Sequence, residues 1–159
     1  MPIMTLDRTD RRILEHLQAD GRLSNQELAE RVSLSPSPCL RRVRALERSG
    51  VIQRYAALLD PLRVGLELLA YVSVKLEKRG KMPVDQFTRA VQSWPEVITC
   101  FSMTGDMDYL LRVQVENLAH FSRFIMNQLL KQPGVIDIKS NFVLERVKET
   151  TALPLEHLA

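Results

Sequence analysis

Residues 35–50 form a basic segment with helix-terminating residues at both ends, SPSPCLRRVRALERSG. Ser37 is a residue type that accepts hydrogen bonds from the free N–H groups of a first helical turn, and Pro38 suits the first helical position. Gly50 can adopt the left-handed conformation that ends a helix. The segment therefore predicts one short helix between Ser37 and Gly50.

This predicted helix has an apolar face and a basic face. Leu40, Val43 and Leu46 recur at three-residue spacing, and we expect them to be buried. Arginines form the second stripe, which consists of Arg41, Arg44 and Arg48 with Arg42 beside it. Core packing explains the first stripe but not the second. Composition alone supports a surface for a polyanion and a plain solvated basic face equally well.

The excess of positive charge lies in the first part of the chain. The 159 residues carry a net charge of +3, and 11 arginines, no lysine and 8 acidic residues precede Leu66. The remaining residues are neutral overall. Arginine makes planar, bidentate contacts with phosphate and guanine that lysine makes less well. A polyanion partner would therefore contact the N-terminal part.

Two further helices are predicted before the basic one. Asp7 opens the first and Gly21 ends it, while Ser24 and Glu27 form a capping box that opens the second. Residues 33–36 make a tight turn into the basic helix. This order is typical of a helix-turn-helix whose last helix lies in the DNA major groove. A structural three-helix bundle would share the spacing, but it would not need arginines along the exposed face of the third helix only.

Residues 51–60 are rich in strand formers, and we expect a strand there that acts as a wing. Arg54 and Tyr55 within it suit two roles equally, contact with DNA phosphates or strand pairing with a partner subunit. Residues 61–66 are the plausible hinge because they include Pro61 and Gly65. The predicted organisation is a DNA-binding domain over 1–60, a linker over 61–66 and a second domain over 67–159.

The second domain alternates strand and helix patterns. Strands are predicted over 66–77, 97–104, 109–115 and 135–147, with helices after the first and third. The expected inward positions of the two helices are Val84, Phe87, Ala90, Val91, and then Leu118, Phe121, Ile125, Leu129, with Asn117 as the second N-cap. The order βαββαβ predicts a ferredoxin-like domain and hence an α+β fold. Apolar residues on both faces of the last strand suggest that a second subunit covers the open sheet face.

The turn Thr104-Gly-Asp-Met-Asp-Tyr109 gathers polar groups between two strands. Gly105 permits the chain reversal, and backbone N–H groups next to Asp106 and Asp108 suit a small zwitterion with a carboxylate and an ammonium group. The alternative is that both aspartates only make the hydrogen bonds of a hairpin turn. From the residues alone, that alternative is favoured.

Other kinds of chemistry find little support. His16, His120 and His157 are isolated, and no additional ligands accompany the two aspartates, so we expect neither a metal nor a catalytic site. Cys39 and Cys100 lie in unrelated contexts and are expected to be reduced. No apolar run is long enough to span a membrane and the N-terminus lacks a signal-peptide core, so we expect a cytoplasmic protein.

Several motifs together resemble one family. They are LDRxDxxIL from Leu6, DGRLS from Asp20, ELA from Glu27, LSPSPCLxRVxxLE from Leu34, GVI from Gly50 and GDxDYLL from Gly105. In this order and spacing the chain resembles the Lrp/AsnC (feast/famine) family of transcription regulators, closest to its leucine-responsive branch. The resemblance covers nearly the whole chain. A lysine-rich tail before Leu6, which some relatives have, is missing here.

The resemblance implies a winged helix-turn-helix joined to an effector domain called RAM. It implies homodimers that pair through their sheets and assemble four at a time into an octamer. A small amino acid, leucine or methionine in our expectation, would bind between effector domains, with no other cofactor. The implied lining residues are Ser102, Met103, Thr104, Gly105, Asp106 and Asp108, with Ala70, Leu118 and residues 141–143, including Asn141, approaching from neighbouring strands or subunits. The turn thereby gains support as part of a ligand site.

The resemblance also implies that double-stranded DNA is the partner of the basic helix in a bacterial, nucleoid-associated regulator. The expected contact residues are Ser24, Asn25, Ser35, Ser37, Pro38, Cys39, Arg41, Arg42, Arg44 and Arg48. Ser35, Ser37 and Cys39 would lie nearest the base edges, while the arginines would combine phosphate anchoring with base reading. The alternatives are an amino-acid-binding enzyme on the ferredoxin-like sheet and a structural assembly protein.

Overall fold

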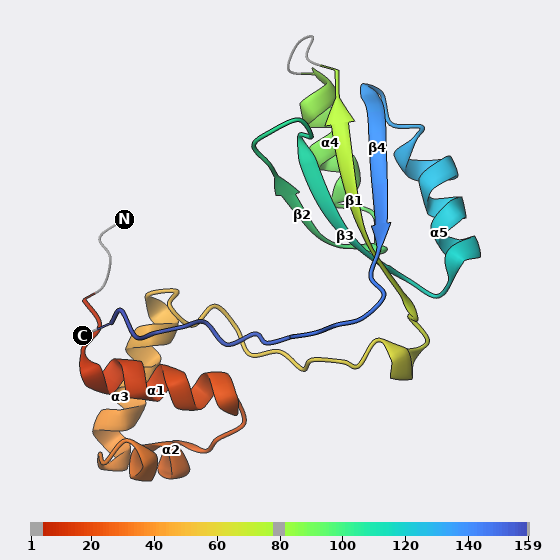
Figure 1. The fold of residues 1–159 in the computed structure, drawn as a ribbon. Helices are drawn as coiled ribbons and strands as arrows, with labels where there is room; N and C mark the ends of the chain where they lie inside the picture. Colours follow the sequence, from red (N-terminus) through yellow and green to blue (C-terminus); the bar gives the residue numbers. More distant parts are fainter. Residues whose placement is uncertain (1–4, 78–81, 159) are drawn as a thin grey trace. The chain divides into compact units, whose positions relative to one another are not determined.

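The computed structural model describes residues 5–77 and 82–158, and the chain divides into two compact units (Figure 1). The first unit comprises residues 1–58 and 148–159, and the second comprises residues 59–147. The first is helical and the second combines a sheet with helices, so the α+β fold class is confirmed. No helix in the described ranges is both long and apolar enough to cross a membrane.

The first unit contains the predicted helix-turn-helix. Its helices are α1 (Arg8–Ala19), α2 (Asn25–Arg31) and α3 (Pro36–Arg48). Asp7 caps α1, and Ser24 and Glu27 form the predicted capping box at the start of α2. Seven buried side chains hold the three helices together, namely Ile13, Leu14, Leu28, Ala29, Val32, Cys39 and Leu46.

Helix α3 begins earlier than predicted. Ser35, not Ser37, is its N-cap residue, and Pro36 is the first helical residue. The Ser35 side chain makes no capping hydrogen bond. A capping side chain accepts from the N–H of the second or third helical residue, and Pro38 in third position has no N–H to offer. Gly50 has a φ of +78°, as its predicted role at the helix exit requires.

The buried stripe of α3 also differs from the prediction. Cys39 and Leu46 are fully buried and Val43 packs against the same core, whereas Leu40 is 36% exposed. A helix repeats every 3.6 residues, so the spacing of four and three residues from Cys39 to Leu46 follows one face. Strict three-residue spacing from Leu40 drifts away from it.

The predicted strand over residues 51–60 is absent from the structure. These residues are assigned to no strand, and Tyr55, Leu58 and Leu59 are at least half exposed. A strand requires a hydrogen-bonded neighbour, and high strand propensity alone does not supply one. The linker that follows contains a short 3₁₀ turn, Leu62–Val64, which ends at Gly65 with a φ of +80°.

The second unit has the predicted βαββαβ order. Its elements are β1 (Leu68–Leu76), α4 (Met82–Val91), β2 (Val97–Ser102), β3 (Tyr109–Val115), α5 (Leu118–Phe124) with a π-helical extension (Ile125–Leu129), and β4 (Val135–Phe142). The strands lie in the order β2-β3-β1-β4 with antiparallel neighbours (Figure 1). Strand β4 ends five residues before its predicted end at residue 147.

One sheet face and the two helices form the core of this unit. Alternate residues of β1 and β3 are buried against it, as are Phe87 of α4 and Phe121 of α5. Two predicted inward positions are instead exposed, Val84 by 38% and Leu118 by 58%. Phe124 occupies the core in place of Leu118. Both exceptions lie in the first turn of a helix, or close to it, where the helix has not yet reached the sheet core.

The C-terminal residues 148–158 pack with the helical unit, while the second domain was predicted over 67–159. Leu155 packs against the helical core. The side-chain amide of Gln18 bonds the backbone of Leu153 in both directions. The prediction assigned all residues after the linker to one domain because a tail without secondary structure carries no sequence signal for its packing partner.

Candidate DNA-binding face and effector turn

The exposed face of α3 carries the basic stripe. At about 100° per residue, Ser37, Leu40, Arg41, Arg44 and Arg48 fall within one arc of roughly 100° centred close to Arg44. All five side chains are exposed. The predicted contact residue Ser35, at the N-cap, is exposed as well.

Cys39 does not share this face. It is fully buried in the helical core, and burial raises the pKa of its thiol. The expectation that Cys39 lies near DNA base edges is therefore wrong. Pro38 is half-buried beside it.

Arg42 points away from the exposed arginines. Its Nη1 lies 2.7 Å from Asp7 Oδ2 and 2.8 Å from Asp10 Oδ1, at the N-terminus of α1. The Asp10 N–H that bonds Asp7 and the Arg42 guanidinium both lower the pKa of the Asp7 carboxyl. The two carboxylates in turn raise the pKa of Arg42. This guanidinium, predicted to contact DNA, is engaged inside the domain.

Ser24 and Asn25 also serve the helix arrangement. The Ser24 hydroxyl accepts a hydrogen bond from the Glu27 N–H, and its own N–H donates to the Glu27 carboxylate. Asn25 Nδ2 donates to the carbonyl of Pro36 at 2.8 Å, across the turn between α2 and α3. Both residues lie at the start of α2, where an additional contact with DNA stays a prediction.

The two candidates after α3 have different surroundings. The Tyr55 hydroxyl donates to Glu47 Oε1 at 3.0 Å. Burial is the main cause that raises the pKa of Tyr55, and the Glu47 carboxylate raises it further. Arg54 is exposed.

The predicted effector turn follows β2. Gly105 has a φ of +109°, a conformation that favours glycine, and residues 102–106 are all exposed. The Met103 N–H donates to the carbonyl of Asp108 at 2.8 Å, which closes the turn. The turn thus holds its backbone groups in a defined, solvent-facing arrangement.

Asp108 has a structural partner. Its N–H donates to the carbonyl of Val74, and its Oδ2 accepts from the N–H of Leu76 at 2.7 Å. The carboxylate therefore extends the β1–β3 ladder by one bond at the point where β1 has an irregularity, between Lys75 and Leu76. This bond joins Asp108 to another strand and is not the bond within the hairpin turn that the residues alone favoured, and one carboxylate can accept further bonds.

A hollow of about 270 Å³ adjoins the turn. Its lining residues are Leu76, Glu77, Val84, Ser102, Met103, Asp108 and Tyr109. Leu76, Glu77, Val84 and Tyr109 were not predicted here. The position of Val84 in the first turn of α4, before the buried residues of that helix, could have indicated that it is available to line a site. The hollow combines apolar side chains with the carboxylate of Asp108.

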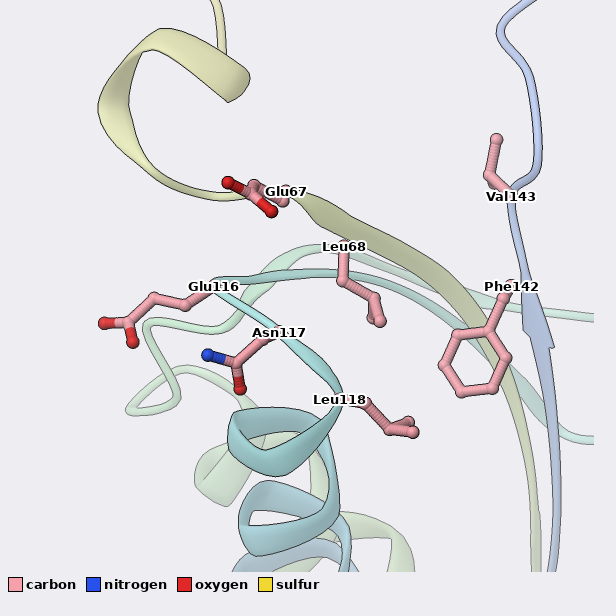
Figure 2. A pocket seen from close by; sticks show the side chains of 7 residues that line it. All are labelled: Glu67, Leu68, Glu116, Asn117, Leu118, Phe142 and Val143. Carbon is pink, nitrogen blue, oxygen red and sulfur yellow. The ribbon is translucent and has the colours of Figure 1, made fainter.

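The remaining predicted effector residues lie at the other end of the sheet. Asn141 pairs with Tyr71 in β1, five residues from Leu76, which corresponds to about 17 Å along a strand. A second hollow of about 330 Å³ lies at this end (Figure 2), and its lining residues are Glu67, Leu68, Glu116, Asn117, Leu118, Phe142 and Val143. Ala70 is fully buried, so its side chain cannot line an effector site as expected.

The described residues contain no group of three or more His, Cys, Asp or Glu side chains that could hold a metal ion. Both cysteines in this part of the chain are free thiols, and burial raises the pKa of Cys100 as it does that of Cys39.

Comparison with known proteins matches each unit to a known domain family. Residues 6–53 match a winged helix-turn-helix DNA-binding domain, and residues 69–153 match the Lrp/AsnC ligand binding domain. The chain belongs to the Lrp/AsnC family of transcription regulators. It is 44% identical to the leucine-responsive regulatory protein of Escherichia coli K12 over 155 residues, which cover 98% of this chain and 94% of that protein.

Solved Lrp/AsnC structures agree with this fold. A transcriptional regulator from Neisseria meningitidis, solved as a complex with L-methionine, is 50% identical and superposes with a TM-score of 0.95 over 98% of this chain and 100% of that chain. An AsnC family regulator from Agrobacterium tumefaciens is 39% identical, with a TM-score of 0.91 over 97% and 100% of the two chains. The family consists of DNA-binding regulators and not of enzymes.

Proposed function

We propose that this regulator binds double-stranded DNA through the exposed face of α3, and that leucine or methionine at the Gly105 turn controls that binding. The observation that carries the DNA part is the single arc with Arg41, Arg44 and Arg48 on the third helix of a winged helix-turn-helix. Arginines in one arc suit a groove flanked by phosphates. The N-terminal Ser35 and Ser37 would lie nearest the base edges.

The effector part of the proposal draws on the turn and its neighbouring hollow. The turn offers backbone N–H groups for a ligand carboxylate, Asp108 offers an acceptor for its ammonium group, and Met103 and Val84 offer apolar contacts for its side chain. Methionine is supported by the 50% identical Neisseria regulator that was solved with it, and leucine by the name of the E. coli relative.

A second copy of the chain would complete the effector site. Asn141 pairs with Tyr71, about 17 Å along β1 from Leu76 beside the turn, so residues of both groups can surround one ligand only if they come from different chains. Exposed apolar side chains at the two ends, such as Met103 and Phe142, support contact between copies. We propose homodimers that associate further, up to the octamer, and act at the bacterial nucleoid in the cytoplasm.

The ligand would control DNA binding through the assembly state that it prefers. An effector that binds one assembly or dimer orientation more tightly shifts the population toward it, and DNA affinity follows. Activation or repression then depends on where the regulator sits at each promoter.

Calorimetric titration of the full chain with L-methionine and L-leucine tests the effector part, with D-methionine as control ligand. We expect Asp108→Asn to weaken binding of the recognised amino acid by at least about tenfold, because it removes the charge that faces the ammonium group. An asparagine oxygen can still accept from the Leu76 N–H, so the sheet should stay intact. Unchanged affinity in Asp108→Asn would refute the assignment of Asp108 to the site.

The DNA part is tested with duplexes that the full chain selects from a random-sequence library. Arg41→Ala should weaken binding and lower the slope of log affinity against log salt by about 0.9 for each lost phosphate contact. Arg89→Ala, an exposed arginine on α4, is the matched control and should leave the slope unchanged.

A further inference from the structure

We propose that Arg42 is a positioning residue that fixes α3 against α1, and that it does not contact DNA. The proposal rests on the proposed function of α3 as the DNA-binding helix. It divides the arginines of this helix into three that face outward and one that holds the helix in place.

The Arg42 side chain points away from the exposed face of α3. Arg42 lies about 160° around the helix from Arg44, the centre of the exposed arc. On that opposite side it meets the N-terminus of α1, where one nitrogen bridges Asp7 and Asp10. A side chain committed to α1 in this way cannot reach the surface on which Arg44 lies.

Asp10, one of the two partners of Arg42, is largely buried. The Asp10 side chain is only 8% exposed, and its neighbour Asp7 is a second carboxylate within the same capping box. Two carboxylates this close repel each other, and a largely buried one without a cation is costly. Arg42 contacts both carboxylates at once and offsets one of their two negative charges, so the position of α3 against α1 depends on this ion pair.

The other two helix pairs have polar contacts of the same kind. Arg12 Nη2 donates to the Arg31 carbonyl at 2.6 Å and thereby joins α1 to the end of α2. Asn25 joins α2 to the first turn of α3. Each pair of helices thus has a directional bond besides its apolar packing, which fixes an angle better than apolar contact alone. The Arg42 pair is the one of these contacts that involves ionised partners on both sides.

The direction in which Asp7→Asn changes DNA affinity distinguishes a positioning role of Arg42 from a DNA contact. Asparagine is a good N-cap, so Asp7→Asn keeps the cap of α1 but replaces the oxygen that accepts from Arg42 with a donor group. If Arg42 positions α3, this variant should weaken DNA binding. If Arg42 contacts a phosphate, removing the acidic competitor should strengthen it, since the variant also loses a negative charge near the DNA.

The experiment measures the affinity of the full chain for its selected duplexes over a range of salt concentrations. We expect Arg42→Ala and Asp7→Asn each to weaken binding by at least about fivefold with an unchanged salt slope, and the double variant to be no weaker than Arg42→Ala. Arg44→Ala, the control on the same helix, should lower the slope.

Three results would overturn the proposal. They are tighter binding by Asp7→Asn, a slope that falls in Arg42→Ala as it does in Arg44→Ala, and unchanged affinity of Arg42→Ala at a temperature where circular dichroism shows it folded. The last result would mean that the ion pair only stabilises the fold. Failure of the unmodified chain to select any duplex would instead refute the proposed function.

A separate observation concerns Leu40, and from it we infer a specificity-determining contact with the C5-methyl group of a thymine. Leu40 is an exposed apolar residue on the DNA-facing arc, about 40° from Arg44, and it is not among the residues that build the helical core. It lies in the N-terminal half of α3, and N-terminal residues of a recognition helix contact base edges. An apolar side chain in the major groove recognises the thymine methyl group.

Deoxyuridine tests this contact because it removes only the methyl group. Replacing the thymines of a selected duplex one at a time should identify a position where the chain loses about threefold or more in affinity. Leu40→Ala should bind the thymine duplex more weakly and lose nothing further at that position. If no replacement weakens binding, or if Leu40→Ala loses as much as the unmodified chain, the inference is wrong.

Discussion

The side chain of Gln18 in α1 holds the backbone of Leu153 by two hydrogen bonds, one donated by its amide nitrogen at 3.1 Å and one accepted by its oxygen at 2.6 Å. The pair joins residues 135 positions apart in the sequence. Leu155 packs on the helical core next to it, and Arg11 Nη1 lies 3.4 Å from the carbonyl of Leu158. A chain segment that leaves the effector domain is thereby fastened to the DNA-binding domain.

Replacing Gln18 should release this segment. Gln18→Ala removes two hydrogen bonds, which together contribute about 1–2 kcal/mol to the attachment of residues 148–158. We expect faster hydrogen exchange at the Leu153 amide, with exchange in α2 little changed. Gln26→Ala, an exposed glutamine on α2, is the control. Equal exchange at Leu153 in both variants would show that Leu155 alone holds the tail.

Two leucines of α3 should differ sharply in their importance for stability. Leu46→Ala empties a fully buried position and should cost about 2–5 kcal/mol in the free energy of unfolding of the helical unit. Leu40→Ala, the same substitution six residues earlier, should cost less than about 1 kcal/mol because Leu40 stays partly in water. Urea unfolding followed by helical circular dichroism checks both, and comparable losses would contradict the exposed position of Leu40.

The sequence predicted best those features whose partners are close along the chain. The capping box of Ser24 and Glu27 was predicted residue by residue because its hydrogen bonds span three positions. The strand and helix order of the effector domain followed from local periodicity in the same way. Gly105 was likewise identified from the demands of its own turn.

Features with distant partners could not be predicted in this way. Arg42 looked like its neighbours in the basic stripe, because nothing local reveals that Asp7, 35 positions earlier, lies beside it. Cys39 was assigned to the DNA side because it lies near the N-terminus of the recognition helix, but its side chain is buried in the helical core. The strand expected over 51–60 has strand-forming residues, yet pairing depends on a neighbour that propensity does not reveal.

Acid should weaken α2 through Glu27. Hydrogen bonds from the Ser24 hydroxyl and backbone lower the pKa of this carboxyl below its ordinary 4.5. The folded chain therefore favours the ionised form, and the resulting stabilisation is complete above that ordinary value and is lost as the pH falls through the lowered pKa. In an NMR titration, Ser24→Ala should move the Glu27 midpoint upward. An unmoved midpoint would show that the hydroxyl does not hold the carboxylate.

Gly105 should be required for conformation and not for space. A Cβ added there meets no atom within 4 Å, but the φ of +109° is strained for any residue with a side chain. We expect Gly105→Ala to fold with a rearranged turn, at a cost of about 1–2 kcal/mol, and to bind L-methionine at least about tenfold more weakly. Calorimetry gives the affinity and backbone NMR shifts give the turn. Because Gly105 itself lies outside the strands, changes spreading to Val72 or Val113 in the sheet core would contradict this account.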